Sequence, residues 1–325
     1  MTILIICIAA VAIVLLIAYK IYRVVFYAPP ARRKDFGEPL VGTQYEAVAE
    51  DIYRIGHIMQ RYPCERIERT SFDGYQLIGR YYHIRDDAPL EILFHGYRSC
   101  TFRDCAGCHA LARKLGFNVL AVEQRAHGES GSNTIAFGIL ERHDCLQWVQ
   151  YATDRFGSDV PIILSGLSMG AATVLMSAGL NLPPNVACII ADSPYSSPCA
   201  IIEKVCHDLR YPVALCRPFL HLAARIFGHF SLHSASAKEA VAQSRIPMLL
   251  LHGEADQLVP CSMSAELYAS NPEMVTLHTF PDAGHCLCYL VDPIRYEKVV
   301  YDFLQTIPQI ASQISENFTQ QKYET

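Results

Sequence analysis

Residues 160–176 read VPIILSGLSMGAATVLM, in which a serine between two glycines separates two apolar runs. This order predicts a strand, a sharp turn and a helix. Gly166, Ser168 and Gly170 match the pattern G-x-S-x-G, which at such a junction is typical of a nucleophile elbow. The serine backbone of an elbow is strained, side chains at the glycine positions would crowd it, and the hydroxyl stands exposed beside the helix N-terminus. A Gly/Ser-rich loop without chemistry is the alternative, and the rest of the chain decides between the two.

The composition fits one large domain with appendages. The chain has 325 residues, and 51% of them are hydrophobic, which is enough for a sizeable core. A net charge of −5 and the lack of a basic patch argue against a nucleic-acid partner. The 13 cysteines are odd in number and irregularly spaced, which argues against a disulfide framework and for free thiols in a reducing compartment.

One cysteine motif could bind a cofactor or a metal. Cys105, Cys108 and His109 match C-x-x-C-H, the attachment pattern of c-type haem, and Cys100 would add a ligand to a zinc site. The surrounding stretch Phe102–Leu115 has the spacing of a helix that places the cysteines on one apolar face. Small cysteines that pack a helix explain the motif more simply, so we expect no cofactor and no metal here.

The N-terminus predicts a membrane helix. Ile3 to Tyr19 is a run of 17 residues without charge, just long enough to cross a bilayer core. A cleaved signal peptide would carry positive charge before the run and a small-residue cleavage site after it, so an uncleaved anchor over residues 1–27 is favoured. Positive residues follow the run: Lys20, Arg23, Arg32, Arg33 and Lys34. The positive-inside rule then predicts a single-pass membrane protein whose main domain faces the cytoplasm.

Beyond a linker at 28–44, the chain alternates between strand and helix patterns through a domain at 45–310, and a polar tail follows at 311–325. Two runs that flank Asp73-Gly74 predict a hairpin. Short apolar strands are expected at 91–94, 118–122, 161–164, 187–191, 248–251 and 275–279, with helices at 45–62, 102–115, 138–156 and 169–179. This alternation predicts a mostly parallel, doubly wound sheet with the hairpin as its antiparallel edge. Residues 196–244, the lid segment, break the alternation with three helical stretches at 200–209, 218–227 and 235–243.

An elbow serine needs a base and an acid, and the sequence offers a histidine and an aspartate after two later strands. Asp256 follows the strand at 248–251, and His285 follows the strand at 275–279. The carboxyl ends of parallel strands meet at one edge of a sheet, so both side chains are expected near Ser168. The order Ser…Asp…His is that of the elbow-bearing fold. Asp192 at the end of the strand at 187–191 is the second candidate for the acid, and Asp282 is expected to be a turn residue.

Four matches together carry a family resemblance over about residues 65–309: His95-Gly96-Tyr97 after one strand, the stretch 125–130 (RAHGES) after the next, the elbow, and the two loops with Asp256 and His285. The chain resembles serine hydrolases of the α/β-hydrolase superfamily, of the monoacylglycerol-lipase and serine-aminopeptidase type, including bacterial membrane-anchored members. Ala126 departs from the pattern, since many relatives have glycine there. The resemblance implies an α/β-hydrolase fold with a helical lid.

The expected roles follow from this constellation. Ser168 attacks an acyl carbonyl, His285 moves the proton, and Asp256 fixes the imidazole. Backbone N–H groups of Met169 and Tyr97 are expected to hold the oxyanion of the intermediate. His95, His127 and His252 are expected to make structural hydrogen bonds. Cys286 and Cys288 are expected to pack rather than react.

The expected activity is hydrolysis of carboxylic esters with short or medium acyl groups, or of monoacyl lipids. Aromatic residues near or on the lid segment suggest an apolar pocket, with Tyr195 and Phe219 as substrate-binding candidates. An aminopeptidase, amidase or thioesterase of the same fold is an alternative, with Glu203 or Asp208 to bind a substrate amine. A non-catalytic, membrane-tethered binding module is the alternative from another class. The oligomeric state does not follow from the sequence.

Overall fold

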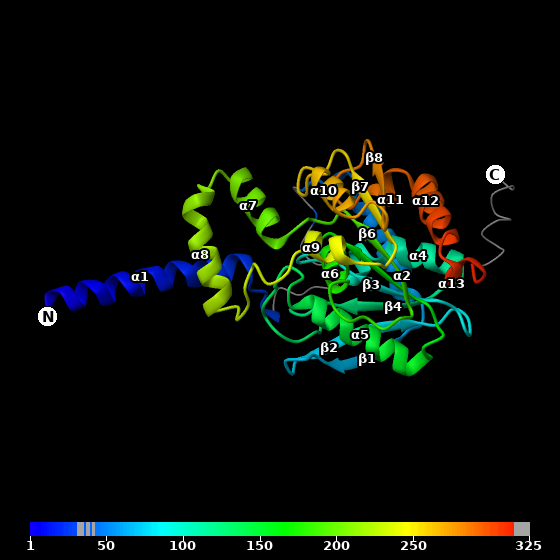
Figure 1. Ribbon diagram of the computed structural model, residues 1–325, viewed down its shortest axis with the longest axis horizontal. Helices are drawn as coiled ribbons and strands as arrows, with labels where there is room; N and C mark the ends of the chain where they lie inside the picture. The colour runs from blue at the N-terminus through cyan, green and yellow to red at the C-terminus, as the bar shows by residue number, and fades with distance from the viewer. Residues whose placement is uncertain (31–35, 37–39, 41–42, 315–325) are drawn as a thin grey trace.

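An eight-stranded sheet forms the centre of the computed structural model, which describes residues 1–30, 36, 40 and 43–314 (Figure 1). The strand order is β1-β2-β4-β3-β5-β6-β7-β8. The strands are β1 (Glu65–Thr70), β2 (Gln76–Tyr82), β3 (Leu90–Phe94), β4 (Asn118–Glu123), β5 (Ile162–Leu167), β6 (Val186–Asp192), β7 (Met248–Gly253) and β8 (Val275–Phe280). β1 and β2 pair in antiparallel fashion, β2 pairs with β4 likewise, and every other pair is parallel. The predicted mostly parallel sheet with an antiparallel hairpin edge is confirmed.

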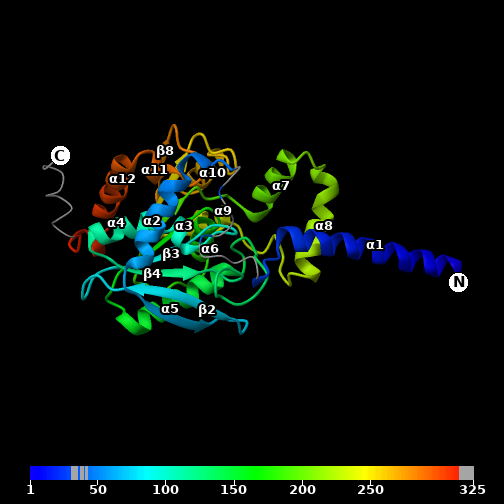
Figure 2. The ribbon, with the colours of Figure 1, turned by 180° about the vertical axis from the view of Figure 1, so that it is seen from behind.

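Helices cover both faces of the sheet. The strands β3 to β7 are buried along their whole length, as expected for parallel strands that have a helical layer on each side. One layer contains α5 (Glu141–Phe156), α6 (Met169–Ser177), α9 (Ala237–Gln243) and α10 (Ser262–Ser270). The other contains α2 (Ala49–Arg61), α4 (Ala106–Leu115), α12 (Pro293–Gln305) and α13 (Pro308–Ala311). Figures 1 and 2 view the molecule from these two sides.

Several helices differ from the sequence expectation. The stretch predicted as one helix over 102–115 is two, α3 (Thr101–Asp104) and α4, which meet at Cys105 (φ −90°, ψ −3°). A short 3-10 turn η2 (Glu46–Val48) precedes α2. The helices after residue 260, including α11 (Cys288–Val291), were not predicted. The clearest of these, α12, begins with Pro293 after Asp292, whose carboxylate accepts a hydrogen bond from the Arg295 amide at 3.0 Å.

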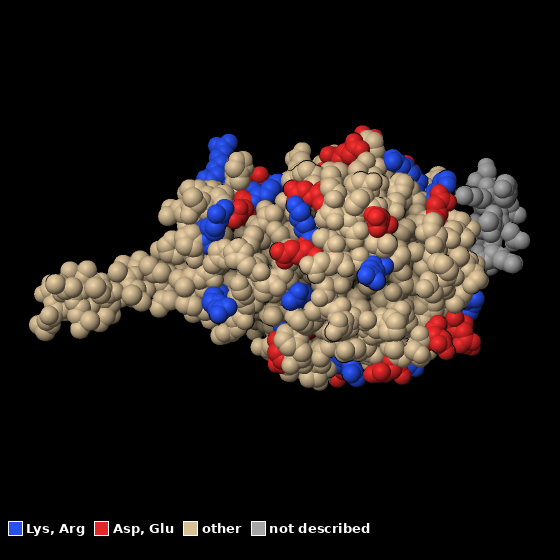
Figure 3. Space-filling model, viewed as in Figure 1, with Lys and Arg blue, Asp and Glu red and all other residues tan. Residues whose placement is uncertain are grey.

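A long apolar helix projects from the domain. α1 (Thr2–Val25) is long and apolar enough to cross a membrane, with a mean hydropathy of 3.0 over its best window, and the same length and composition fit a signal sequence. No Lys, Arg, Asp or Glu marks its projecting end on the face seen in Figure 3. Its last turns pack on the domain, where Ala18, Tyr22 and the following Phe26 are buried.

The lid segment lies beside this helix. Its first two helices, α7 (Pro198–Asp208) and α8 (Val213–Ile226), stand apart from the sheet next to α1 (Figures 1 and 2). α8 packs directly against α1, and the Phe227 ring that follows it lies 5.2 Å from the Tyr19 ring and 5.9 Å from the Tyr22 ring. The insertion between β6 and β7 is helical as predicted, while its first two helices extend sideways.

The structure describes only part of the linker and of the tail that the sequence predicts. Arg32, Arg33 and Lys34, most of the linker at 28–44 and most of the tail at 311–325 lie outside the described residues. All 13 cysteines lie within the described part, and all are free thiols there, as expected.

Candidate active site

The backbone around Ser168 explains the two glycines of the motif. Ser168 stands between the end of β5 and the start of α6 with φ 53° and ψ −116°, a region that L-residues rarely occupy. A Cβ atom on Gly166 would lie 2.3 Å from the Gly170 carbonyl carbon, and one on Gly170 would lie 2.1 Å from the Phe94 carbonyl oxygen. Both contacts are with backbone, which cannot move aside, so only glycine fits either position.

The structure brings the three predicted catalytic side chains together. His285, in the loop after β8, places Nε2 2.8 Å from the Ser168 Oγ. Its other ring nitrogen, Nδ1, lies 2.7 Å from Oδ2 of Asp256, in the loop after β7. The imidazole and the carboxylate are both buried, whereas the serine is half-buried and reachable.

Several hydrogen-bond donors surround the Asp256 carboxylate. Its Oδ1 accepts hydrogen bonds from the amides of Leu258 (2.9 Å) and Val259 (2.8 Å), and His252 Nε2 lies 3.3 Å from Oδ2. Burial alone raises the pKa of this carboxyl, but the hydrogen bonds from His252 and His285 and from the Val259 amide outweigh burial and hold the pKa well below its usual range. An ionised Asp256 favours the tautomer with the proton on Nδ1 of His285, which leaves Nε2 to accept the serine proton.

The other histidines near the site make structural hydrogen bonds, as predicted. His95 Nε2 accepts from the Gln124 amide at 3.1 Å, and His127 Nε2 accepts from the Arg98 amide at 2.9 Å. The His252 ring is fully buried under the acid loop and bonds the Val259 carbonyl (2.9 Å). None of the three contacts the serine hydroxyl in these bonds.

The two expected oxyanion residues flank the serine from different elements. Met169 is the first residue of α6, so its N–H has no partner within the helix. Tyr97 follows Gly96, where a Cβ would lie 3.3 Å from the Ser168 Cβ. The Asp104 carboxylate, which the sequence did not single out, fixes this loop by accepting the Gly96 amide at 2.7 Å.

The same loop is fastened to the N-terminal helix. The Tyr97 hydroxyl donates to the Val25 carbonyl at 2.8 Å, and the Arg98 guanidinium donates to the Val24 carbonyl at 2.6 Å. The last carbonyls of a helix lack partners within it, so these side chains cap the C-terminal end of α1. The membrane-type helix and the expected oxyanion loop are therefore one packed unit.

A cavity of about 200 Å³ opens beside Ser168 and His285. Its wall is mostly apolar and comes from the segment before and within α2, the loop after β3 with α3 and α4, the strand ends, the loop after β7, and the loop after β8 with α11 and α12. The lining residues other than the catalytic pair are Leu40, Tyr45, Ile52, Ile55, Gly96, Tyr97, Arg103, Asp104, Ala106, Gly107, Cys108, Leu167, Asp192, Leu258, Cys286, Leu287, Tyr289, Leu290 and Tyr296. Most of them carry no sequence motif, so sequence reasoning missed them.

The expectation that the lid segment shapes this pocket is wrong, since residues 196–244 are all described and none of them lines it. Neither Tyr195 nor Phe219 lies in the cavity. Tyr195 is buried in the main core, and Phe219 is on α8, which packs along α1 instead of over the strand ends. Glu203 is also absent from the wall and pairs with Arg217 at 2.8 Å.

Two further acids differ in their environments. Asp192 lines the cavity and accepts the Ser193 hydroxyl at 2.9 Å, while His285 donates to Asp256 instead. Burial raises the pKa of Asp192 to about 6. Asp208 is outside the cavity and pairs with Lys204, and Asp282 is exposed in its turn.

The motif Cys105-x-x-Cys108-His109 packs a helix, as expected. Cys105 is buried and Cys108 half-buried in the core on this side of the sheet. The His109 ring lies 4.6 Å from the Tyr82 ring, in an edge contact.

The fold and the serine site define an α/β hydrolase, and the comparisons with known proteins agree. The model of the family described as serine aminopeptidase, S33, matches residues 90–231 and 215–290, which is more than half of the chain. The chain belongs to this family and is a hydrolase.

The chain is similar to proteins of several bacteria and an archaeon. It is 27% identical over 252 residues to the uncharacterized protein YqkD of Bacillus subtilis, an alignment that covers 75% of this chain and 81% of that protein. Among solved structures, the Pyrococcus furiosus esterase Pf2001 superposes with a TM-score of 0.62 at 24% identity, covering 76% of this chain and 93% of the esterase. Est1E of Butyrivibrio proteoclasticus, solved with ferulic acid bound, superposes with a TM-score of 0.58 at 19% identity, covering 74% and 98%. At these identities the likeness to the two structures concerns the fold.

Proposed function

We propose that the protein is a serine esterase that cleaves short carboxylic esters through an acyl-enzyme. One observation carries the proposal: Ser168, His285 and Asp256 form a continuous chain of hydrogen bonds, 2.8 and 2.7 Å long, at the wall of an apolar cavity. The strained backbone at Ser168 supports it, because such strain persists where function requires it.

The reaction follows from the geometry. His285 Nε2 takes the Ser168 proton as Oγ attacks the ester carbonyl, and the amides of Met169 and Tyr97 stabilise the oxyanion. The tetrahedral intermediate breaks its bond to the alcohol oxygen, which receives the proton from His285. Water then attacks the acyl-enzyme with the same assistance, and the carboxylic acid leaves. Asp256 stays ionised throughout.

The cavity favours a short acyl group. Its volume of about 200 Å³ is below the ~300–1,000 Å³ typical of sites for drug-sized ligands, so a long lipid chain does not fit inside it. Recognition of a substrate amine has weaker support, because Glu203 and Asp208 both lie outside the cavity and already pair with basic side chains. These observations favour the esterase over the aminopeptidase.

Substrate panels test the proposal directly. We expect kcat/KM to be highest for p-nitrophenyl esters of about four to six acyl carbons, at least tenfold lower for the laurate ester, and lower still for aminoacyl p-nitroanilides. A preference for the anilides would overturn the ester assignment. No turnover of either class would favour the non-catalytic binding module.

The proposal includes retention of α1 as an anchor. A signal peptide is removed from the mature protein, but the end of α1 contributes to the core of this domain. Tyr22 is buried and its hydroxyl bonds the Thr134 hydroxyl at 2.8 Å, and the Phe26 ring packs edge-on against Phe230 at 5.4 Å. Cleavage after the apolar run at Tyr19 would remove the buried Ala18 and the Tyr19 ring that packs on Phe227 at 5.2 Å, and it would leave Tyr22 and Phe26 without the helix that precedes them, which supports an uncleaved helix.

The length of the free part of α1 brings the domain against the bilayer. Residues 2–17 are all exposed and span about 24 Å at 1.5 Å per residue, which is shorter than the ~30 Å hydrocarbon core. The neighbouring lid segment presents apolar side chains to solvent at Leu209 (62% exposed), Tyr211 (58%) and Leu215 (62%). We infer that α7 and α8 sit in the membrane interface, where such side chains are favourable.

We propose that the domain lies on the cytoplasmic side, and the positive charges of Lys20 and Arg23 after the apolar run and the free cysteines support this orientation. Cys64 is exposed, so its labelling can show on which side of the membrane the domain lies. In intact cells, a membrane-impermeant maleimide should label Cys64 only after the cells are opened. Labelling before lysis would contradict the cytoplasmic assignment, and recovery of the protein in the alkaline wash of the membranes would contradict the anchor.

A further inference from the structure

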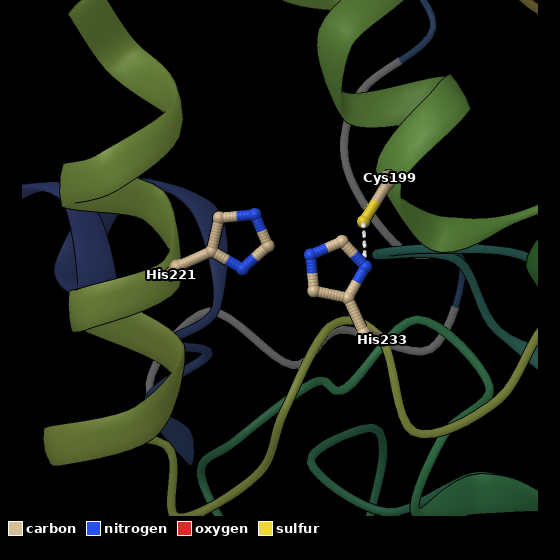
Figure 4. Close-up of side chains that lie close together, drawn as sticks. All are labelled: Cys199, His221 and His233. Carbon is tan, nitrogen blue, oxygen red and sulfur yellow. Dashed lines mark hydrogen bonds between the residues drawn. The ribbon is translucent and has the colours of Figure 1, made fainter.

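One thiol and two imidazoles meet on the lid segment, away from the serine site. Cys199 comes from the first turn of α7, His221 from α8, and His233 from the loop that follows α8 (Figure 4). Their ligand atoms all lie within 4.8 Å of one another. We propose that these three residues bind a Zn²⁺ ion.

The separations suit this ion. Zinc bonds of ~2.3 Å to sulfur and ~2.0–2.1 Å to nitrogen, in a tetrahedral arrangement, place a sulfur and a nitrogen ligand about 3.6 Å apart. The Cys199 Sγ and His233 Nδ1 are already 3.7 Å apart. The His221 ring stacks on the His233 ring with centroids 4.5 Å apart and planes 15° from parallel, so it must turn and approach by about 1 Å to aim a nitrogen at the same point.

The donor set selects the class of metal. Thiolate and imidazole ligands suit Zn²⁺, whereas Mg²⁺ and Ca²⁺ prefer oxygen ligands. The nearby Glu203, one turn after Cys199, is held by Arg217 through bonds of 2.8 and 3.1 Å, so the fourth position falls to a water molecule. The Cys199 thiol now faces the Leu232 carbonyl at 3.6 Å, and it releases its proton to solvent when the thiolate binds the ion.

The ion would join three segments, α7, α8 and the loop that follows α8. Cys199 and His221 are half-buried and His233 is exposed, so the site is open to solvent. α7 also contacts the acid loop, since the Lys204 ammonium donates to the Gln257 carbonyl next to Asp256. Zinc therefore holds α7 and α8 together and steadies the helix that touches the acid loop, without contact to the substrate cavity.

Metal binding by the full-length protein in detergent micelles tests the inference without relying on hydrolysis. After chelator treatment and its removal, Zn²⁺ is titrated in competition with a chromophoric indicator. We expect one ion per chain and affinity weakened at least about tenfold by C199S and by H221Q. Co²⁺ should produce a thiolate-to-metal charge-transfer absorption that C199S abolishes. Zn²⁺ should also raise the melting temperature of the wild type but of neither variant.

Matched controls keep the result specific. C261S changes another half-buried cysteine, and H207Q changes an exposed histidine on α7; both should bind Zn²⁺ like the wild type. The proposal is overturned if the wild type binds no Zn²⁺ beyond the level of the C199S/H221Q double variant, or if Cu⁺ binds there while Zn²⁺ does not. Loss of esterase activity alone would leave these binding readouts intact.

Discussion

Replacing Asp256 with asparagine separates the role of its charge from that of its shape. Oδ1 accepts two backbone amides at 2.9 and 2.8 Å, and Oδ2 faces His285 Nδ1 at 2.7 Å. An asparagine keeps the backbone bonds only if its oxygen takes the Oδ1 place. Its NH₂ group then points at His285 Nδ1, which must present a lone pair and carry its proton on Nε2 instead.

The expected loss is large because the imidazole is then in the wrong tautomer. With the proton on Nε2, His285 donates to Ser168 and cannot act as its base. The same change in a chymotrypsin-type triad lowers kcat by about 10⁴, and we expect a loss of about 10³–10⁴ here. Stability should fall as well, because the NH₂ group faces the His252 Nε2–H at the Oδ2 place (3.3 Å) and the contacts that hold the Asp256 pKa low are lost, although the volume and the two backbone bonds are kept.

Initial rates with p-nitrophenyl butyrate provide kcat and KM, and thermal unfolding checks the fold. D192N is the matched control, because Asp192 is the other buried acid at the cavity and His285 donates to Asp256 instead. We expect D192N to keep activity within about tenfold of wild type. A folded D256N enzyme with a loss below tenfold, or a larger loss in D192N, would refute the assignment of the acid.

The remaining predictions concern the elbow, a buried acid and the acyl group. G170A should abolish soluble active protein, because its Cβ would lie 2.1 Å from the Phe94 carbonyl oxygen. G179A is the control and should behave like wild type, since its nearest contact is 3.3 Å. An active G170A enzyme would contradict the elbow geometry. Burial raises the pKa of Glu91 to about 7, so the unfolded chain loses this proton first and stability falls as pH rises from about 4.5 through 7. E91Q should remove this fall in the free energy of unfolding, which is about 3 kcal/mol in the wild type. Urea unfolding at pH 5 and pH 8 measures it, and an unchanged pH dependence in E91Q would refute the raised pKa of Glu91 as its cause. A laurate ester cleaved as fast as the butyrate would show that the cavity does not limit the acyl chain.

Much of the sheet and of the catalytic constellation could be predicted from local patterns. The six parallel strands are short runs bounded by loops, and five of them, β3 to β7, are apolar and buried on both faces, which gives a plain signal. Ser168, Asp256 and His285 follow strand ends, so topology alone places them at one edge.

The cavity wall could not be predicted in the same way. The helix expected at 45–62 contains Ile52 and Ile55, but its apolar pattern does not say which neighbour it covers, and both residues line the cavity. The direction of the lid segment depends on the packing of α8 against α1, a contact between residues about 200 positions apart. Cys199, His221 and His233 likewise have no motif spacing and meet only through the fold.

Covalent labelling shows whether Ser168 is the nucleophile. The full-length protein is treated with a fluorophosphonate probe and digested, and the modified residue is located by mass spectrometry beside an S168A control. We expect one adduct per chain, on Ser168, and neither labelling nor measurable ester hydrolysis in S168A, a loss of at least about 10⁴-fold. An adduct on another residue, or an S168A protein that still hydrolyses the butyrate ester at the wild-type rate, would contradict it.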